Sequence, residues 1–103
     1  MKKLGFGCMR LPLVPGTENR VDLDRFTAMV DQYMGAGFGY FDTAHVYLGG
    51  NSETALREGL VKRYPRESFT LTDKLSGSCY QKEADIRPFF EQQLKWCGVN
   101  YFD

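Results

Sequence analysis

The sequence predicts an α/β fold in which short parallel strands alternate with helices. Short apolar runs open at Leu4, Phe38, Phe69 and Val99, and their starts are about 30 residues apart, the length of one βαβ step. Three stretches with helical apolar spacing separate these runs. A strand followed by a helix at each step indicates a parallel sheet. Since the chain has 103 residues, it has room for one small domain or part of one.

The first apolar run, from Leu4 to Leu11, is expected to form strand one. Residues 12–20 follow it and include two prolines and Gly16, so this segment is expected to be a loop. The next apolar residues recur at the spacing of one helix face, at Phe26, Val30, Tyr33 and Met34. A first helix is therefore predicted from Leu23, with Asp22 as its cap and Gly35 as its end.

The second predicted helix begins at Asn51 or Ser52, because either side chain can cap a helix. Glu53 stands four residues before Arg57, which is the spacing of an ion pair on a helix surface. Pro65 ends the helix. Its apolar face is formed by Ala55, Leu56, Leu60 and Tyr64.

The third predicted helix has an apolar face made by Ile86, Phe89, Phe90 and Leu94. Pro88 would break a helix interior, but it is tolerated in the first turn, where its missing N–H has no partner to lose. The helix is therefore expected to start late, with Asp85 as its cap, and to end near Gly98. The last apolar run would open a fourth strand.

Charge and composition exclude several classes of protein. Thirteen Lys and Arg residues balance thirteen Asp and Glu residues, so no positive field favours nucleic acid or anionic lipid. Uncharged runs fall short of the roughly 20 apolar residues of a membrane span. The amino end lacks the apolar stretch of a signal peptide, and three widely separated cysteines suit neither a disulfide framework nor a zinc site. A soluble cytoplasmic protein with reduced thiols and no metal site is expected.

Three side chains are predicted to meet at one edge of the sheet. Asp42 ends the second apolar run and Lys74 ends the third, and the carboxyl ends of parallel strands lie together, where ligands bind. Tyr47 follows Asp42 by five residues, in a loop that Gly49 and Gly50 allow to fold back over this edge.

An acid, an ammonium and a phenol at one place can act together as a proton donor. A phenol with a pKa of about 10 is a weak donor at neutral pH, but a nearby ammonium lowers that pKa, and a carboxylate can hold the ammonium in place. The chemistry that suits this group is delivery of a proton to a carbonyl oxygen while another group attacks the carbon.

The same residues carry a resemblance to a known family. The stretch from Gly37 to Ala44, GFGYFDTA, then Tyr47, the stretch from Gly50 to Glu53, GNSE, and Thr72-Asp73-Lys74 match successive motifs of the aldo-keto reductases. The sequence resembles that family over its whole length. The resemblance implies a (β/α)8 barrel that transfers hydride from NADPH to a small carbonyl substrate, using an Asp, Tyr, Lys and His tetrad.

On this resemblance, residues 1–103 form the amino-terminal part of a (β/α)8 TIM barrel, with about three βα units and the start of a fourth strand. The barrel domain would be incomplete at its carboxyl end. The first strand is similar to the branch of the family that carries a carboxyl-terminal ferredoxin-like iron-sulfur domain. An iron-sulfur cluster could belong only to a longer form.

The resemblance also assigns roles to single residues. Asp42, Tyr47 and Lys74 are the candidate catalytic residues. Gly7, Cys8 and Met9, near the end of strand one, join Asp42 as candidate cofactor-binding residues, although Gly5 and Gly7 also suit tight packing of that strand. The family's tetrad histidine lies beyond a Tyr-x-Asp like that at 101–103, so His45 is expected to be exposed or packed and not catalytic.

Two hypotheses of different classes follow. In the first, the chain is part of a full-length carbonyl reductase, in which Tyr47 donates the proton, Lys74 lowers the pKa of Tyr47 and Asp42 anchors Lys74. The chain alone is then expected to be inactive. In the second, the chain is a non-catalytic barrel fragment or binding module. An open sheet exposes unpaired edges, so such a fragment should associate with itself or with a missing carboxyl-terminal half.

Overall fold

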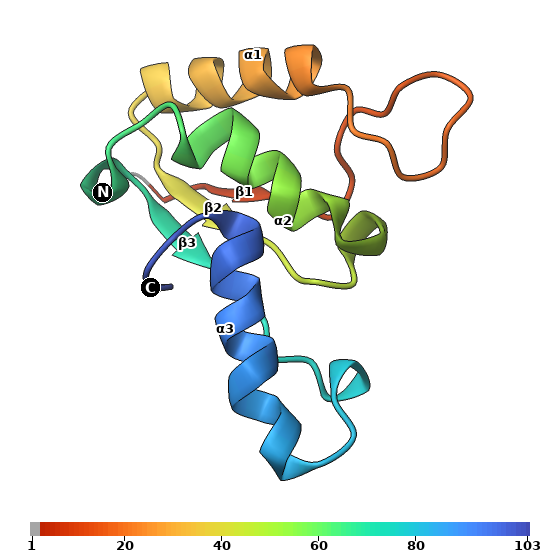
Figure 1. Cartoon of the computed structure of the whole chain (residues 1–103). Coiled ribbons are helices and arrows are strands. Elements are labelled where there is room, and N and C mark those ends of the chain that lie inside the picture. The colour runs from red at the N-terminus through yellow and green to blue at the C-terminus, as the bar shows by residue number, and fades with distance from the viewer. Residues whose placement is uncertain (1–2) are drawn as a thin grey trace.

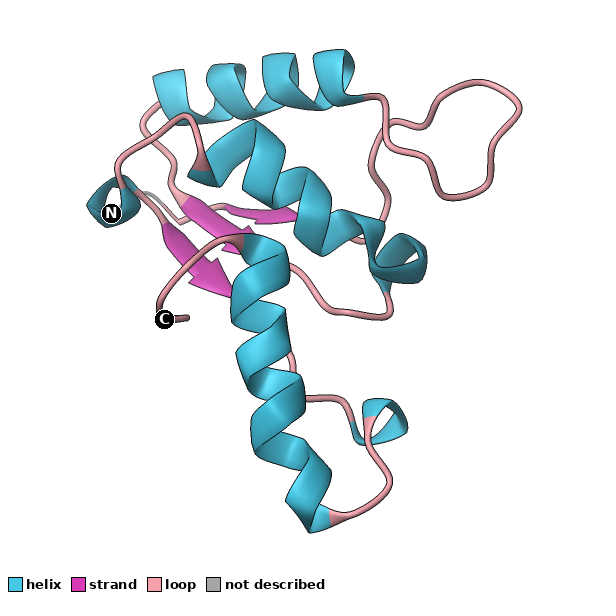
Figure 2. Cartoon of the chain, in the orientation of Figure 1, coloured by secondary structure: helices cyan, strands magenta, loops and turns pink. Residues whose placement is uncertain are grey.

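A computed structural model describes residues 3–103 and contains a parallel sheet of three strands. The strands β1 (Gly5–Gly7), β2 (Tyr40–Asp42) and β3 (Thr70–Thr72) lie in the order in which they occur in the sequence. Figure 1 shows that helices α1 and α2 run along the same side of this sheet, while α3 extends away from it. The predicted parallel α/β arrangement is therefore confirmed, and Figure 2 shows how short the strands are relative to the helices.

Helix α1 (Leu23–Gly35) has the bounds that the sequence predicts. The Asp22 carboxylate accepts a hydrogen bond of 3.2 Å from the Arg25 amide, as an amino-terminal cap does. Phe26 and Val30 are fully buried on the inner face. Gly37, just past the helix, has a φ of 92°, a left-handed conformation that glycine adopts without strain.

Helix α2 (Asn51–Leu56) begins directly after Gly50 and continues into a π-helical turn, η2 (Arg57–Val61). The prediction that Asn51 or Ser52 caps this helix is wrong, because both residues lie inside its first turn. Their side chains bind elsewhere: the Asn51 amide donates to the Asn19 carbonyl at 2.9 Å, and the Ser52 hydroxyl donates to the Cys8 carbonyl at 2.7 Å.

The predicted ion pair between Glu53 and Arg57 does not form. Glu53 is fully buried on the inner side of α2, whereas the Arg57 guanidinium binds the neighbouring Glu58 at 3.0 Å. The π-helical turn also brings Gly59 close to α1. A Cβ at Gly59 would lie 2.9 Å from the ring of Phe26, so only glycine allows this approach.

Helix α3 (Ile86–Cys97) starts late, with Pro88 in its first turn, as predicted. Asp85 precedes it but makes no side-chain cap, since its carboxylate accepts from the Lys82 amide at 3.3 Å. The predicted apolar face is also only partly correct. Gln93 and Cys97 are the buried residues of this helix, and Phe90 is 39% exposed, because the amino-terminal half of α3 extends beyond the rest of the fold (Figure 1).

The core lies between the sheet and the helices and is rich in aromatic rings. The rings of Phe6 and Phe41, from β1 and β2, stack with centroids 5.4 Å apart, and Tyr33 of α1 packs edge-on against both. Side chains alternate between the two faces of a strand. The opposite face of the sheet therefore carries small or polar residues, namely Gly5, Gly7, Tyr40, Asp42, Thr70 and Thr72.

Two connecting segments have defined structure. Residues 12–20 form a hairpin-like loop, which projects from the fold in Figure 1 and closes through a bridge between Leu13 and Val21. At the carboxyl end, the Asp103 amide donates to the Leu71 carbonyl at 2.9 Å. Residues 101–103 thus lie beside β3, where a fourth strand was predicted, although they form no regular strand themselves.

Candidate active site

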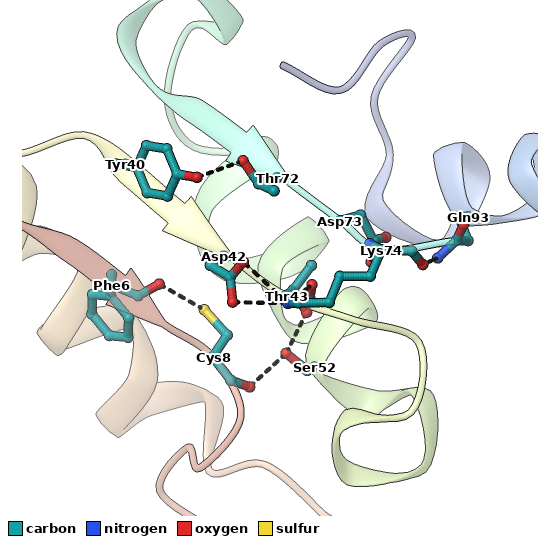
Figure 3. Close-up of polar contacts among 10 residues, drawn as sticks. All are labelled: Phe6, Cys8, Tyr40, Asp42, Thr43, Ser52, Thr72, Asp73, Lys74 and Gln93. Carbon is teal, nitrogen blue, oxygen red and sulfur yellow. Dashed lines mark hydrogen bonds and ion pairs between the residues drawn. The ribbon is translucent and has the colours of Figure 1, made fainter. Parts of the chain in front are cut away.

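Asp42 and Lys74 meet at the carboxyl edge of the sheet, as the sequence predicts. The Lys74 ammonium lies 3.1 and 3.0 Å from the two carboxylate oxygens of Asp42 and donates to the Thr43 carbonyl at 2.9 Å. Figure 3 shows the lysine side chain reaching from the end of β3 across to the end of β2. Three acceptors match the three N–H bonds of an ammonium, so its donors are all satisfied.

This ion pair contributes little to stability, because both partners reach solvent. The Lys74 side chain is 42% exposed and that of Asp42 is 34% exposed, and exposed pairs contribute only about 0–1 kcal/mol. Burial lowers the pKa of Lys74, but the neighbouring Tyr47 and Asp42 side chains raise it by more, so that the pKa lies above its usual value. Lys74 is therefore a charged, oriented ammonium at neutral pH.

Tyr47 lies next to this pair. The centroid of its ring is 4.8 Å from the Lys74 Nζ, within cation–π distance. The turn that follows contains three residues in succession with positive φ, Leu48 at 54°, Gly49 at 64° and Gly50 at 95°. The glycines act as the sequence predicts, whereas Leu48 was not foreseen. A left-handed leucine costs roughly 1–2 kcal/mol, and its partly buried side chain packs against the core in return.

Ser52 joins the ends of the first two strands to helix α2. Its buried hydroxyl donates to the Cys8 carbonyl at 2.7 Å and lies 2.7 Å from the Thr43 hydroxyl. Figure 3 shows these three residues immediately beside Asp42 and Lys74. The Gly-Asn-Ser-Glu stretch therefore holds the floor of the site together, a role that sequence analysis did not assign to it.

The candidate cofactor-binding residues of strand one differ in their exposure. The Cys8 side chain is fully buried, and burial together with the Asp42 carboxylate raises the pKa of its thiol to about 12. Met9 is 54% exposed. A Cβ on Gly7 would meet no atom within 4 Å, so no other side chain fills the space beside this glycine. Cofactor contact by these residues stays a prediction.

His45 is packed into the fold, which is one of the two alternatives that the sequence left for it. Its ring stacks on Trp96 of α3 with centroids 4.4 Å apart, and Phe89 contacts it edge-on. Its Nδ1 lies 2.7 Å from the Glu53 carboxylate. An ionised Glu53 only accepts, so Nδ1 carries the proton of this hydrogen bond when Glu53 is ionised.

A buried polar network lies behind the Asp42–Lys74 pair, and sequence analysis missed it. Glu53, Asp73 and Cys97 have potential ligand atoms within 4.8 Å of one another. Hydrogen bonds already engage both carboxylates, so we describe the group as a network and not as a metal site. The available signal was an acidic residue in each of two motifs that flank the site, in Gly-Asn-Ser-Glu and in Thr-Asp-Lys.

The fold and this site define a class of protein. Three βα units place an aspartate, a lysine and a tyrosine together at the carboxyl edge of a parallel sheet. The family model described as "Aldo/keto reductase family" matches residues 3–103. The chain belongs to the aldo/keto reductase family, and it corresponds to the amino-terminal part of a (β/α)8 barrel.

Individual relatives agree with this assignment. A curated relative, 4-dihydromethyl-trisporate dehydrogenase from Mucor mucedo, is 32% identical over 104 residues, which are 96% of this chain and 28% of the relative. The names of this relative and of the solved structures below are those of oxidoreductases. The chain thus spans under a third of the length of the curated relative that it matches.

Solved structures show the same fold. A thermostable aldo-keto reductase in complex with the inhibitor epalrestat matches with a TM-score of 0.77 and 22% identity, over 100% of this chain and 36% of that chain. The holo form of an aldo-keto reductase from Bacillus halodurans matches with a TM-score of 0.75 and 24% identity, over 98% and 34%. Aldose reductase from Schistosoma japonicum has a TM-score of 0.66 and 26% identity, over 96% and 30%.

The resemblance of strand one to the iron-sulfur branch stays a prediction. Within residues 3–103, no helix has both the length and the apolar character that crossing a membrane requires.

Proposed function

We propose that this chain supplies the proton-donating site of an NADPH-dependent carbonyl reductase when it is part of a complete barrel. The observation that carries the proposal is the contact of Lys74 with both Asp42 and Tyr47 at the carboxyl edge of the sheet, in a chain that belongs to the aldo/keto reductase family. The substrate class is a small aldehyde or ketone.

Each of the three residues has a distinct task in the proposed reaction. The Tyr47 hydroxyl donates its proton to the carbonyl oxygen of the substrate. The Lys74 ammonium lies beside the phenol, and a positive charge there favours release of the proton. Asp42 holds the ammonium with both carboxylate oxygens. NADPH, when bound, supplies the hydride.

The open face of the sheet suits a cofactor beside the reacting atoms. Gly7 leaves free space where a side chain would otherwise project, and the Asp42 carboxylate is partly exposed next to it. We propose that Gly7, Met9 and Asp42 contact the cofactor with their accessible atoms. Cys8 would support the site from within and not contact the cofactor, because the whole residue is buried, its amide donates to the Asp42 carbonyl and its carbonyl accepts from Ser52.

The 103-residue chain is expected to be inactive by itself. It corresponds to about a third of the chains that it matches among solved structures, so most of the surface that would orient cofactor and substrate is supplied by other segments. Loss of orientation and of electrostatic stabilisation removes most of the rate enhancement of an enzyme.

The test is NADPH oxidation with an aldehyde by a form of the protein that completes the barrel. Tyr47→Phe should lower turnover by about 10²–10⁴, the usual contribution of general acid catalysis, and leave NADPH affinity nearly unchanged. Tyr40→Phe is the matched control, since Tyr40 also presents a hydroxyl on the open face. Equal rates for the parent and Tyr47→Phe would refute the proposal.

The second candidate is a non-catalytic module that associates with itself or with a missing half of the barrel. In the sheet of the described residues, β1 pairs with β2 alone and so has a second edge available for pairing. The open face of the sheet carries small or polar residues, so the unpaired edge of β1 is the observation that favours this candidate. Sedimentation of the purified chain tests it: dimers or larger species support it, and a compact monomer at micromolar concentration contradicts it.

Two further expectations are kept as proposals. We propose a cytoplasmic protein, and we propose that it has no nucleic-acid partner because its charges balance. Equal retention of the chain on heparin and on an uncharged resin would agree with the second point.

A further inference from the structure

Glu53 is a buried acid that the proposed reaction does not use. Its side chain has no exposed surface, and its two oxygens accept different donors. The Nδ1 of His45 lies 2.7 Å from Oε1, and the amide of Gln93, on α3, donates to Oε2 at 3.3 Å. N–H donors favour the ionised form of a carboxyl group, but burial outweighs them here and holds the pKa of Glu53 above its usual value.

Asp73 lies next to Glu53 and contacts the main chain of Lys74. Its Oδ1 accepts from the Lys74 amide at 2.8 Å, and the thiol of Cys97 is 3.7 Å from Oδ2. One carboxyl oxygen of Asp73 and one of Glu53 lie within 4.8 Å of each other. Two carboxylates this close in a buried site repel each other when both are ionised, so one of the two groups retains a proton.

We propose that Glu53 and Asp73 share one proton and that, together with Gln93, they are positioning residues that fix the main chain of Lys74. The effect of this positioning on catalysis rests on the proposed function. The network itself does not, because all of its residues lie within this chain.

The network binds both polar main-chain groups of Lys74, its N–H and its carbonyl. Asp73 accepts from the Lys74 N–H at 2.8 Å, and the buried amide of Gln93 donates to the Lys74 carbonyl at 2.9 Å. The same Gln93 nitrogen contacts Glu53, so the acid pair and the lysine carbonyl share one donor. Lys74 lies two residues past the end of β3. Its main chain is therefore bound by the side chains of Asp73 and Gln93 and not by a neighbouring strand.

The surroundings of the pair determine which acid keeps the proton. His45, in the loop after β2, contacts Glu53. From α3, Gln93 contacts Glu53 and Cys97 contacts Asp73. The Lys74 ammonium is directed toward Asp42 (Figure 3). Burial, then the hydrogen bond and charge of Glu53, raise the pKa of Asp73 to about 8. Burial also raises the pKa of Glu53, but hydrogen bonds from Asp73 and Gln93 oppose that rise. At neutral pH the proton therefore resides on Asp73.

The buried thiol of Cys97 does not compete for this role. Burial and the nearby Asp73 carboxyl raise its pKa, so it stays a neutral thiol. The network thus holds a titratable proton on Asp73.

The first experiment is a carboxyl-carbon NMR titration of the unmodified chain, with the Lys74 amide observed in the same samples. We expect the Asp73 carboxyl to titrate near pH 8, with the Lys74 amide shift following the same midpoint. Asp73→Asn should abolish the step in the Lys74 amide shift. Glu58→Gln is the matched control, because Glu58 is a half-exposed glutamate in η2 outside the network, and it should leave the midpoint unchanged.

Two further variants test whether the network positions Lys74. Glu53→Gln keeps the shape of the side chain and can donate to Asp73, so the Asp73 midpoint should fall by at least about one pH unit. Glu53→Ala should speed exchange of the Lys74 amide proton about tenfold through local opening, and Glu53→Gln should restore slow exchange.

Titration of both carboxyls below pH 5 in the parent chain would overturn proton sharing. Amide exchange at Lys74 as slow in Glu53→Ala as in the parent would overturn the positioning role. Neither readout depends on carbonyl reduction, so a failure of this inference is distinct from a failure of the proposed function.

Discussion

The two faces of the sheet differ more than any other two regions of this chain. On the face toward the helices, Phe6, Phe41 and Leu71 are packed in a core where Phe41 and Leu71 have no exposed surface. The face on the other side of the same strands carries glycine, threonine, Tyr40 and Asp42. Strands three residues long thus separate an aromatic core from an open polar surface.

The difference shows how stability and chemistry are divided within each strand. In β2, Tyr40 and Asp42 point to the open face and Phe41 points into the core. Aromatic burial contributes most of the stability, whereas the exposed Asp42–Lys74 pair contributes little. Changes on the core face should therefore unfold the chain, and changes on the open face should alter the site while leaving the fold intact.

The largest expected effect is that of Phe41→Ala. The Phe41 ring is fully buried and contacts the rings of Phe6, Tyr33 and Phe69. Its removal should lower the free energy of unfolding by about 3–5 kcal/mol, which is a large part of the stability of a small domain. Urea unfolding followed by far-UV circular dichroism measures this, and a loss below about 1 kcal/mol would contradict the division between the faces.

The pH dependence of stability should show a smaller effect from Asp73. Its pKa is raised from 3.8 to about 8 in the folded chain, so the folded state binds more protons than the unfolded state between these values. The free energy of unfolding should therefore fall as pH rises from 5 to 8, with a slope below about 1.4 kcal/mol per pH unit because Asp73 is partly exposed.

Asp73→Asn isolates this contribution. The asparagine cannot ionise, so the variant should lose stability less steeply than the parent over the same pH range. Urea unfolding at pH 5.5, 7 and 8.5 gives the comparison. Parallel pH profiles for the two proteins would show that Asp73 does not bind the extra proton.

The smallest expected effect is that of Tyr40→Phe. The Tyr40 hydroxyl accepts a hydrogen bond from Thr72 at 3.0 Å across the open face, and the tyrosine is more than one-third exposed. Since water can replace this partner, the free energy of unfolding should change by less than about 1 kcal/mol. A loss similar to that of Phe41→Ala would show that the open face is part of the core, and the same unfolding curves decide the point.

Much of the fold was predictable because hydrophobic spacing determines it. The bounds of α1 and its Asp22 cap follow from a local pattern, and so does the late start of α3 at its proline. The meeting of Asp42 with Lys74 follows from a topological rule, that parallel strands end at one edge. These features depend on neighbouring residues or on strand order, both of which a single sequence contains.

The errors arose where side chains bind partners that are distant in the sequence. Ser52 was a plausible helix cap, yet its hydroxyl binds the Cys8 carbonyl, 44 residues away. Glu53 had a suitable partner in Arg57 four residues on, yet it is buried against Gln93, 40 residues away. Helix caps and ion pairs four residues apart are patterns of exposed residues. Ser52 and Glu53 are buried, so they bind partners distant in the sequence instead.

The left-handed conformation of Leu48 was unpredictable for a different reason. Its two glycine neighbours indicate a turn, but leucine disfavours a positive φ, so the sequence places the left-handed residues at Gly49 and Gly50 alone. In the structure Leu48 has a φ of 54°. Its side chain packs against the core, which fixes the turn that presents Tyr47.

The most direct test of this account compares Tyr47→Phe with His45→Ala in a form that completes the barrel, by pH–rate profiles and by unfolding. Tyr47→Phe should lower kcat/KM by about 10²–10⁴ with little change in stability. His45→Ala should keep kcat/KM within a few-fold of the parent but lose about 1–3 kcal/mol, since buried Glu53 loses a donor. If His45→Ala removed the acidic limb of the profile and reduced the rate as much as Tyr47→Phe, the imidazole would be the proton donor and the account would be contradicted.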